Sequence, residues 1–397
     1  MYVARPLSMY RMQPSALSVP TPEAPYSGYL VITDEESEAQ DRCCWGMYKN
    51  KQVRELPFPQ NKILTIVHHS SGSEDHGSSS VDRHKLWFVP VLDQPLSSNR
   101  YYVIRAKGKH KGQACRCSRE AYVNTCCFCN FEKDVKPRIL NYRDIYQQVE
   151  IHRRRGPDGG FVAKSASPDG YPPFFLKRKG WEAYASSIHH CQLSEALGLN
   201  ISLRMRLPEF DFPMSSKRSG TVVVGKWYCP FVFIREKLKL KAQMKKSMFY
   251  QMTLEQFWEE IYTCDNDKNE VNVVKVNVSV QKEVAIIFGM EAMKDDTCGV
   301  DEVMWFRLLD HNKRGLSVGL SSAIVGKMRW LQETVGWVDG VETDVRVEKV
   351  EEFRGDGVWN KLGCYMLVER FALRRMDGSL LLTYDFRHTH HIQSRWE

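Results

Sequence analysis

The chain has 397 residues, 43% of them hydrophobic and 11% aromatic, with a formal net charge of +8 at pH 7. This composition excludes an intrinsically disordered chain and fits two or three domains with sizeable cores. No uninterrupted apolar stretch is long enough to predict a transmembrane segment, and the N-terminal residues lack the apolar core of a secretion signal. We therefore expect a soluble intracellular protein, cytoplasmic or nuclear, with reduced cysteines.

The positive charge is concentrated in the middle of the chain. Residues 100–250 hold 29 Lys and Arg against 12 Asp and Glu, whereas residues 1–99 and 251–397 carry net charges of −2 and −7. Such a basic region is typical of proteins that contact nucleic acid or an anionic membrane surface. The alternative is that these cations are solvated or face the acidic last third of their own chain.

Taken in chain order, the first expected unit is a Pro- and Ser-rich mobile segment over residues 1–25. A β-rich module is predicted over 26–150, with a disordered Ser- and Gly-rich loop at 70–84 and a second loop at 108–125. Residues 151–200 are predicted to form a basic helical connector. Short helices are expected near it at 141–151, 180–187 and 193–199.

A second β-rich module is predicted over 201–397, and a recurring order of motifs links it to the first. The segment that begins at Trp87 reads WFVPVLDQP and the segment that begins at Trp227 reads WYCPFVFIRE. Both follow Leu-Pro, Phe-Pro and a β-branched strand, which predicts a diverged internal duplication. Because proline lacks an amide donor, Pro90 and Pro230 are expected on edge strands or at bulges.

Three further elements are predicted in this second module. Thr253 to Gln256 resembles a capping box and predicts a helix, and apolar residues at helical spacing predict an amphipathic helix over 318–335. Arg235, Lys237, Lys239 and Lys241 alternate along an apparently extended segment, where a lysine-lined edge would discourage aggregation.

The C-terminal residues predict a β-hairpin. Two strand-like segments flank Asp377-Gly378, the dipeptide typical of a two-residue type I′ turn. That register sets Arg370 opposite Asp385 and Phe371 opposite Tyr384. Many antiparallel strands with a few packed helices indicate an α+β fold.

Ser317 is the most specific enzymatic candidate, because Gly315 to Gly319 fits the G-x-S-x-G pattern of serine hydrolases. Asp385 and His388 would be its nominal partners. However, polar residues rather than a strand precede Gly315, so we interpret Ser317 as the N-cap of the following helix. The hydrolase stays an alternative.

Two clusters suggest metal binding. The first contains thiols that could hold Zn²⁺ tetrahedrally, at C-x-C and C-C-x-C rather than C-x-x-C spacing: Cys115, Cys117, Cys126, Cys127 and Cys129. Reduced structural cysteines or an acylated cluster are the alternatives, so we assign no cofactor and leave zinc open. The second cluster is His388 and His390 on one strand face, near Glu369, where an ordinary histidine–carboxylate pair is the alternative.

Basic and aromatic residues interleave at Lys177, Arg178, Lys179 and Trp181, as in surfaces that stack nucleobases. No zinc-finger, RNP or helix-turn-helix signature accompanies them. Core aromatics beside a solvated turn are the alternative interpretation.

Several long motifs resemble the plant family catalogued as domain of unknown function 1262. They are MYVARPLSMYR, RELPFPQNK, CCFCNF, GKWYCPFVFIRE and VERFALRRMDGSLLLTYDFRHTH. The resemblance implies a plant intracellular protein from a family without an established activity, and it supplies no catalytic residues. We therefore predict a non-enzymatic binding or regulatory protein with an unidentified protein partner. Nucleic acid or an anionic membrane surface remain possible ligands of the basic region 100–250.

Overall fold

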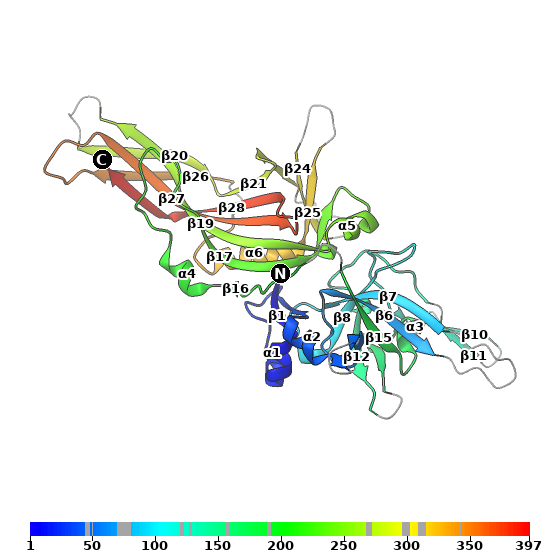
Figure 1. Ribbon diagram of the computed structural model, residues 1–397. Coiled ribbons are helices and arrows are strands. Elements are labelled where there is room, and N and C mark those ends of the chain that lie inside the picture. The colour runs from blue at the N-terminus through cyan, green and yellow to red at the C-terminus, as the bar shows by residue number, and fades with distance from the viewer. Residues whose placement is uncertain are drawn as a thin grey trace.

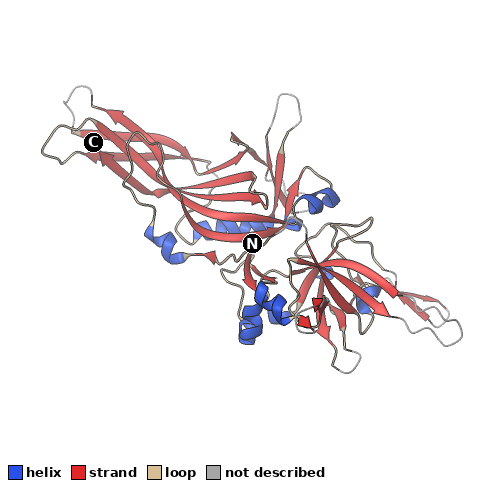
Figure 2. Ribbon diagram, in the orientation of Figure 1, coloured by secondary structure: helices blue, strands red, loops and turns tan. Residues whose placement is uncertain are grey.

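The computed structural model describes residues 1–43, 48–49, 51–69, 81–119, 123–126, 129–132, 134–155, 159–188, 192–266, 272–295, 302–308, 315–340 and 343–397. Strands dominate the chain and helices are short and few (Figure 2). All strand pairs are antiparallel except β1 and β2, which are parallel. The expectation of mostly antiparallel sheets with a few packed helices is therefore confirmed.

A nine-stranded sheet runs through the larger half of the elongated molecule (Figure 1). Its long central strands, β19, β27 and β28, extend from the middle of the molecule toward the end that holds the C-terminus. Its strands are, in spatial order, β2 (Gly28–Ile32), β1 (Tyr2–Pro6), β17 (Val222–Pro230), β19 (Phe249–Asp265), β27 (Lys361–Arg375), β28 (Leu380–Trp396), β21 (Glu283–Ile287) and β22 (Met290–Glu291), with β16 (Gly198–Leu199) paired to β17.

A seven-stranded sheet forms the smaller half, at the lower right of Figure 1. Its strands are, in spatial order, β13 (Phe161–Ser165), β12 (Gln148–Arg153), β8 (Arg100–Arg105), β7 (Val81–Pro90), β6 (Lys62–His69), β15 (Glu182–Ser187) and β5 (Gln52–Val53).

Smaller sheets complete the β-structure. A four-stranded sheet contains β18 (Ile234–Glu236), β25 (Ser317–Ser321), β24 (Val303–Arg307) and β23 (Met293–Asp295). The two-stranded sheets pair β20 (Val273–Gln281) with β26 (Asp344–Glu352), β10 (Val123–Cys126) with β11 (Cys129–Glu132), β9 (Ser118–Arg119) with β14 (Gly170–Tyr171), and β3 (Arg42–Cys43) with β4 (Tyr48–Lys49).

The longest helix, α6 (Ser322–Glu333), packs its apolar side on the nine-stranded sheet, with Ile324, Met328 and Leu331 in the main core. The helix predicted over 318–335 is thus present, although it begins four residues later. The other α-helices are α1 (Leu7–Met12), α2 (Glu35–Gln40), α3 (Phe174–Lys177), α4 (Ile201–Arg206) and α5 (Leu240–Lys246), and the 3₁₀ turns are η1 (Pro14–Ser18), η2 (Leu96–Ser98), η4 (Ile145–Gln147) and η5 (Phe231–Phe233).

One hydrophobic core joins the two large sheets. Trp87 of β7 stacks on Phe231 with ring centroids 5.8 Å apart and meets Phe249 of β19 edge-on at 5.2 Å. Tyr102 of β8 meets Phe233 at 6.3 Å. All five side chains are buried. Aromatic pairs at these distances contribute contact energy beyond the burial of apolar area, so they hold the sheets in one arrangement.

The N-terminal residues take part in this junction. Strand β1 lies between β2 and β17, and Met1 to Ala4 are at most 2% exposed. The Tyr2 hydroxyl donates a hydrogen bond to the Pro90 carbonyl at 2.8 Å. The prediction of a mobile segment over 1–25 is therefore wrong, because these residues bury apolar side chains and complete a sheet.

Several predicted helices are strands. Residues 182–187 form β15 and 253–256 lie inside β19, where Leu254 and Phe257 are buried. The connector 151–200 likewise contains more strand than helix among its described residues. In 253–256 the helix-cap signature is overridden, because these residues are buried and pair with a strand on each side.

The predicted duplication is not confirmed. Trp87 and Trp227 do occupy equivalent places in their strands. The residue two positions after each tryptophan, Val89 or Cys229, pairs with a tyrosine of the next strand, Tyr102 or Tyr250. Upstream, however, the first segment has a separate strand, β6, whereas the matching valines belong to β17 itself.

Proline and loop predictions also differ from the structure. Pro90 and Pro230 each end a strand that has neighbours on both sides, so they lie at strand ends rather than on sheet edges. Of the predicted loop at 70–84, residues 70–80 lie outside the described part and 81–84 begin β7. The predicted loop 108–125 contains β9 and the start of β10.

The C-terminal hairpin and its predicted strand pairs are confirmed, but the turn is not type I′, because only Gly378 has a positive φ, and the register shifts between Leu373 and Arg374. Arg370 pairs with Asp385 and Phe371 with Tyr384 across β27 and β28. The Arg370 guanidinium donates two hydrogen bonds of 2.6 Å to the Asp385 carboxylate.

The shared core predicts a large effect of removing one ring. Phe231→Ala should lower the free energy of unfolding by about 3–5 kcal/mol, because a buried ring is lost and a cavity remains. The matched control is Phe288→Ala, whose ring is 56% exposed and whose removal should cost less than about 0.5 kcal/mol. Urea denaturation of both variants measures the difference, and equal losses would contradict the packing described.

Candidate functional site

Two lysine-rich segments, far apart in the sequence, meet where the two large sheets join. Residues 106–113 read AKGKHKGQ and residues 237–246 read KLKLKAQMKK, and neither contains an acidic residue. The loop after β8 reaches α5, because a Cβ placed on Gly112 would lie 3.1 Å from the Cβ of Leu240. We call the combined surface the basic junction surface; its lysines are Lys107, Lys109, Lys111, Lys237, Lys239, Lys241, Lys245 and Lys246.

The first segment is a compact loop held by its own backbone. Gly112 donates to the Arg105 carbonyl at 2.8 Å, and Arg105 donates to the Gln113 carbonyl at 2.9 Å, which closes the loop at its base. Gly112 has a φ of +89°, a conformation that glycine adopts without strain. The loop therefore presents exposed Lys107 and Lys109 from a fixed base.

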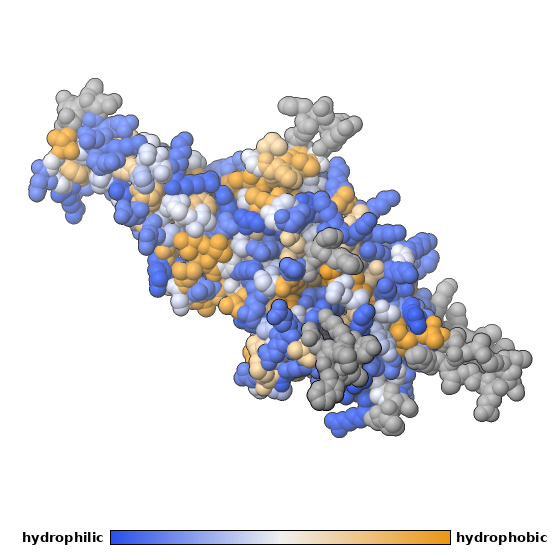
Figure 3. Space-filling view, in the orientation of Figure 1, coloured by the Kyte–Doolittle hydropathy of each residue, from blue (hydrophilic) through white to orange (hydrophobic). Residues whose placement is uncertain are grey.

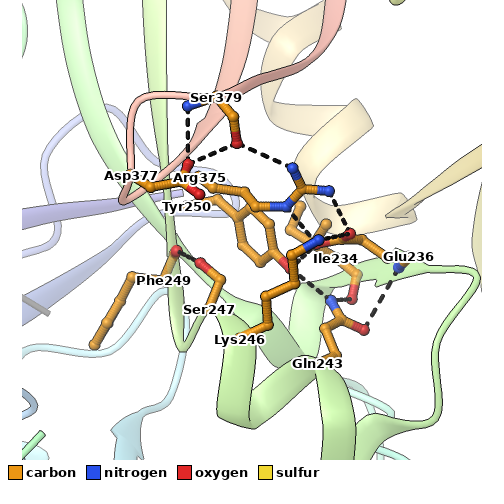
Figure 4. Close-up of polar contacts among 10 residues, drawn as sticks. All are labelled: Ile234, Glu236, Gln243, Lys246, Ser247, Phe249, Tyr250, Arg375, Asp377 and Ser379. Atoms are coloured by element: carbon orange, nitrogen blue, oxygen red, sulfur yellow. Dashed lines mark hydrogen bonds and ion pairs between the residues drawn. The ribbon is translucent and has the colours of Figure 1, made fainter. Parts of the chain in front are cut away.

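The second segment is anchored by a buried polar network (Figure 4). Gln243 of α5 donates to the Ile234 carbonyl at 3.0 Å and to the Tyr250 hydroxyl at 2.9 Å. That hydroxyl donates to Glu236 at 2.7 Å, and Arg375 from the C-terminal hairpin donates to the same carboxylate at 2.6 and 3.1 Å. The predicted extended lysine edge is therefore wrong after Glu236, because the chain turns into α5.

Glu236 does not neutralise the lysines that follow it. Burial alone would raise the pKa of its carboxyl, but hydrogen bonds from Arg375 and Tyr250 lower the pKa below its ordinary value. The charge of Glu236 is thus balanced by Arg375, and Lys246 approaches it only to 3.9 Å.

The basic junction surface keeps its positive charge in the described part of the chain. There, Lys246 is the only one of its eight lysines with an ion pair to an acidic side chain. Lys136 and Arg138 flank the surface, since Arg138 exchanges two backbone hydrogen bonds with Ala114. Arginines from the same basic third do pair with the acidic last third, as Arg204 does with Glu369 and Arg218 with Glu259. The interpretation that the basic region faces the acidic last third of its own chain therefore holds for these two arginines.

A separate cleft of about 950 Å³ lies between α1, α2 and the edge strand β5. Its walls carry both signs of charge, and two ion pairs line it: Arg11 with Asp41 at 2.9 Å and Lys62 with Glu38 at 2.9 Å. This mixed lining does not select a ligand of one charge.

A buried polar cluster holds α4 to the nine-stranded sheet. Arg204 donates two hydrogen bonds to Glu369, at 2.8 and 2.5 Å, and both side chains are at most 3% exposed. Gln332 of α6 donates to the same carboxylate at 2.8 Å and also contacts His388 at 2.9 Å. His388 lies 3.9 Å from Glu369, so the predicted proximity of these two residues is present.

The predicted catalytic residues occupy separate settings. Ser317 begins β25 and pairs with Arg307, while Asp385 is bound by Arg370 and His388 by Gln332. No hydrogen bond between described residues links Ser317 to either partner. The N-cap of α6 is Ser321, so our interpretation of Ser317 as the cap was wrong.

The cysteines fall into two groups. Cys115 and Cys117 are buried, and burial raises the pKa of their thiols to about 12 and about 11, which disfavours the thiolate that binds metal. Cys126 and Cys129 pair across the β10–β11 hairpin, and Cys127 lies outside the described residues. The described residues contain no cluster of three or more metal-ligand side chains, and zinc binding stays a prediction.

The predicted basic and aromatic site is divided between core and surface. Trp181 is fully buried and donates to the Leu176 carbonyl at 3.0 Å. Lys177 lies 4.8 Å from the Tyr171 ring and Arg178 4.5 Å from the Phe174 ring. Trp181 is thus a core anchor, while the neighbouring Lys179 lies in the turn before it.

Sequence reasoning assigned the basic charge to a broad region but missed the junction of its two densest segments. Counting charge in short windows would have found both segments, since each lacks acidic residues. Their contact joins positions more than 120 residues apart and has no local signal.

The fold and site define a mostly β protein of two joined sheets with a lysine-rich surface at the junction. Residues 23–128 match a family model described as protein of unknown function (DUF1262). This match confirms the resemblance drawn from the sequence motifs over that part of the chain, while plant origin stays a prediction. No curated protein matches the chain.

A solved structure, the crystal structure of Cry35Ab1, is similar over 85% of this chain and 90% of that chain, with 12% identity and a TM-score of 0.48. None of the helices in the described residues is long and apolar enough to cross a membrane.

Breaking the largely buried Arg375–Glu236 ion pair should lower the free energy of unfolding more than breaking an exposed arginine–glutamate pair. Arg375→Met should lower the free energy of unfolding by about 2–4 kcal/mol, because it leaves a largely buried carboxylate without its main cation. Arg354→Met is the control: Arg354 pairs with Glu352 but is 84% exposed, so its loss should cost less than about 0.5 kcal/mol. Equal effects in urea denaturation would argue against the network.

His388 predicts a pH dependence of stability. Burial lowers the pKa of its imidazole from 6.5 to about 4, although Glu369 acts in the opposite direction. Between these values the unfolded chain binds a proton that the folded chain does not, so this group destabilises the fold as pH falls from 6.5 toward 4, by about 3 kcal/mol in total. His388→Gln should remove that component, as measured by urea denaturation at pH 7.5 and 4.5. An identical pH dependence in both proteins would refute the assignment.

Proposed function

We propose that the protein is a non-enzymatic binding protein whose basic junction surface holds ligands with several phosphate groups. The observation that carries this proposal is the meeting of two acid-free lysine segments from different sheets. Clustered cations raise the local concentration of anions. When a multivalent anionic ligand binds them, its condensed counterions are released, which makes the free energy of binding more favourable.

The anchoring of both segments supports binding rather than mere solvation. The loop is closed at its base by backbone hydrogen bonds, and α5 is tied to β18 and to the hairpin by Gln243 and Arg375. A surface whose backbone is ordered in advance loses less conformational entropy when a ligand binds. Nucleic acids and phospholipid headgroups, both present in the cytoplasm or nucleus that we propose as its location, carry the required chemistry.

Salt-dependent binding tests the proposal. Wild-type protein should bind fluorescent inorganic polyphosphate with an affinity that falls as KCl rises from 50 to 200 mM. The variant Lys107→Gln, Lys109→Gln, Lys239→Gln, Lys241→Gln should bind at least about tenfold more weakly and show a shallower salt dependence, because it lacks four phosphate contacts.

The control removes four exposed lysines elsewhere: Lys51, Lys164, Lys217 and Lys275, each to Gln. Both variants lose the same net charge, so only the position differs. If the control weakens binding as much as the junction variant, net charge rather than this surface binds the ligand, and the proposal fails.

A further inference from the structure

The basic junction surface continues onto the outer face of the four-stranded sheet. Met293 pairs with Arg307, and Arg307 pairs with Ser317. Glu236 pairs with Val318, which sets the next residue, Lys237, beside Ser317. The Lys237 ammonium also donates to the Gly315 carbonyl at 3.3 Å. With strands about 4.8 Å apart, one row therefore runs from Met293 to Lys237 across about 14 Å.

The two faces of this sheet differ in environment. Phe306 and Val318 point into the main core and are at most 3% exposed. The opposite face carries Arg307 and the half-buried Trp305, which stands beside Gly319. Arg307 pairs with Asp295 at 3.0 Å, so one acidic side chain lies on this face.

Large apolar side chains are exposed on this row and next to it: Met293 lies on the row, whereas Leu316 and Leu238 are sequence neighbours of the row residues Ser317 and Lys237. Met293 is 63% exposed, Leu316 50% and Leu238, between two lysines of the junction surface, 44%. Phe288 in the β21–β22 turn and Met290 at the start of β22, both 56% exposed, precede Met293 in the sequence. In Figure 3 hydrophobic residues gather where Figure 1 places β24 and its neighbours.

We propose that the basic junction surface and this adjoining face together bind the surface of an anionic lipid bilayer. The lysines would meet the phosphate and carboxylate headgroups, while Met293 on this face and Leu316 and Phe288 at its margin would enter the boundary between headgroups and acyl chains. This inference rests on the proposed function and names the ligand of the same surface.

Two alternative partners fit the surface less well. Sequence-tolerant nucleic-acid sites stack bases on exposed aromatic rings, whereas the exposed side chains interleaved with lysine here are chiefly Met and Leu, and Trp181 is buried. Protein–protein interfaces are depleted in lysine, and this surface contains eight. Lysine beside aliphatic side chains, with a tryptophan at the margin, is the composition of membrane-interface surfaces.

The experiment is flotation of the full-length protein with large unilamellar vesicles. One set contains phosphatidylcholine only, and the other contains 30% phosphatidylserine. We expect binding to the anionic vesicles and at least about tenfold weaker binding to the neutral ones, since each lysine near an anionic surface contributes about fivefold in affinity.

Two triple variants separate the apolar contribution from the charge. Met293→Ser, Leu316→Ser, Phe288→Ser should weaken binding to anionic vesicles about tenfold or more and leave polyphosphate binding unchanged. The control is Leu197→Ser, Ile201→Ser, Met205→Ser on and beside α4, where the three side chains are 62–70% exposed. This control should bind both ligands as the wild type does.

The outcomes are distinguishable from those of the polyphosphate experiment. If the wild type binds polyphosphate but not the anionic vesicles, or if the first triple variant floats as the wild type does, the membrane inference is overturned and the phosphate-binding proposal stands. Three results together would assign the surface to nucleic acid instead. The protein would bind a mixed RNA or DNA pool more tightly than the vesicles, the pool would abolish vesicle binding by competition, and the first triple variant would leave vesicle binding unchanged. Failure to bind any polyanion would overturn both proposals.

Discussion

The packing of Trp87 against Phe231 and Phe249 determines how the two sheets of this protein are arranged. Trp87 belongs to the seven-stranded sheet, whereas Phe231 and Phe249 lie on either side of α5 in the sequence. A single apolar core across this junction fixes the end of β8 relative to α5. The adjacency of the two lysine segments is thus a consequence of core packing rather than of any attraction between them, which their like charges would oppose.

The distribution of ion pairs explains why positive charge remains at the junction. Some arginines of residues 100–250 pair with carboxylates, inside the fold as Arg204 does with Glu369, or at the sheet margin as Arg218 does with Glu259. A guanidinium suits such roles because its planar donors match a carboxylate. A lysine ammonium is more strongly hydrated and more flexible, and among the described residues only Lys246 of the eight junction lysines forms an ion pair with a carboxylate.

Local signals in the sequence were sufficient for some elements. Asp377-Gly378 and the alternating residues around it specify a hairpin whose predicted strand pairs the structure shares, and the helical spacing of Ile324, Met328 and Leu331 specifies α6. These elements are governed by turn chemistry and by the period of apolar residues over a short range. The Arg370–Asp385 pair follows directly from the hairpin register.

Other features depend on contacts that the local sequence does not encode. Strand β1 is stabilised by pairing with β17, more than 200 residues away. The sequence around β1 does not contain this partner, and its Pro and Ser content alone predicts a mobile segment. Residues 253–256 carry a helix-cap signature, yet pairing with β17 and β27 on both sides makes them part of a strand. The candidate site is of the same kind: its lysines were visible in the sequence, but the contact between Gly112 and Leu240 arises only from the tertiary core.

Hydrogen–deuterium exchange with and without saturating polyphosphate tests whether the two lysine segments act as one surface. If they do, the ligand slows exchange in peptides covering both 106–113 and 237–246, with no change around 174–181. Protection of only one of these segments, or protection confined to 174–181, would contradict a single shared surface.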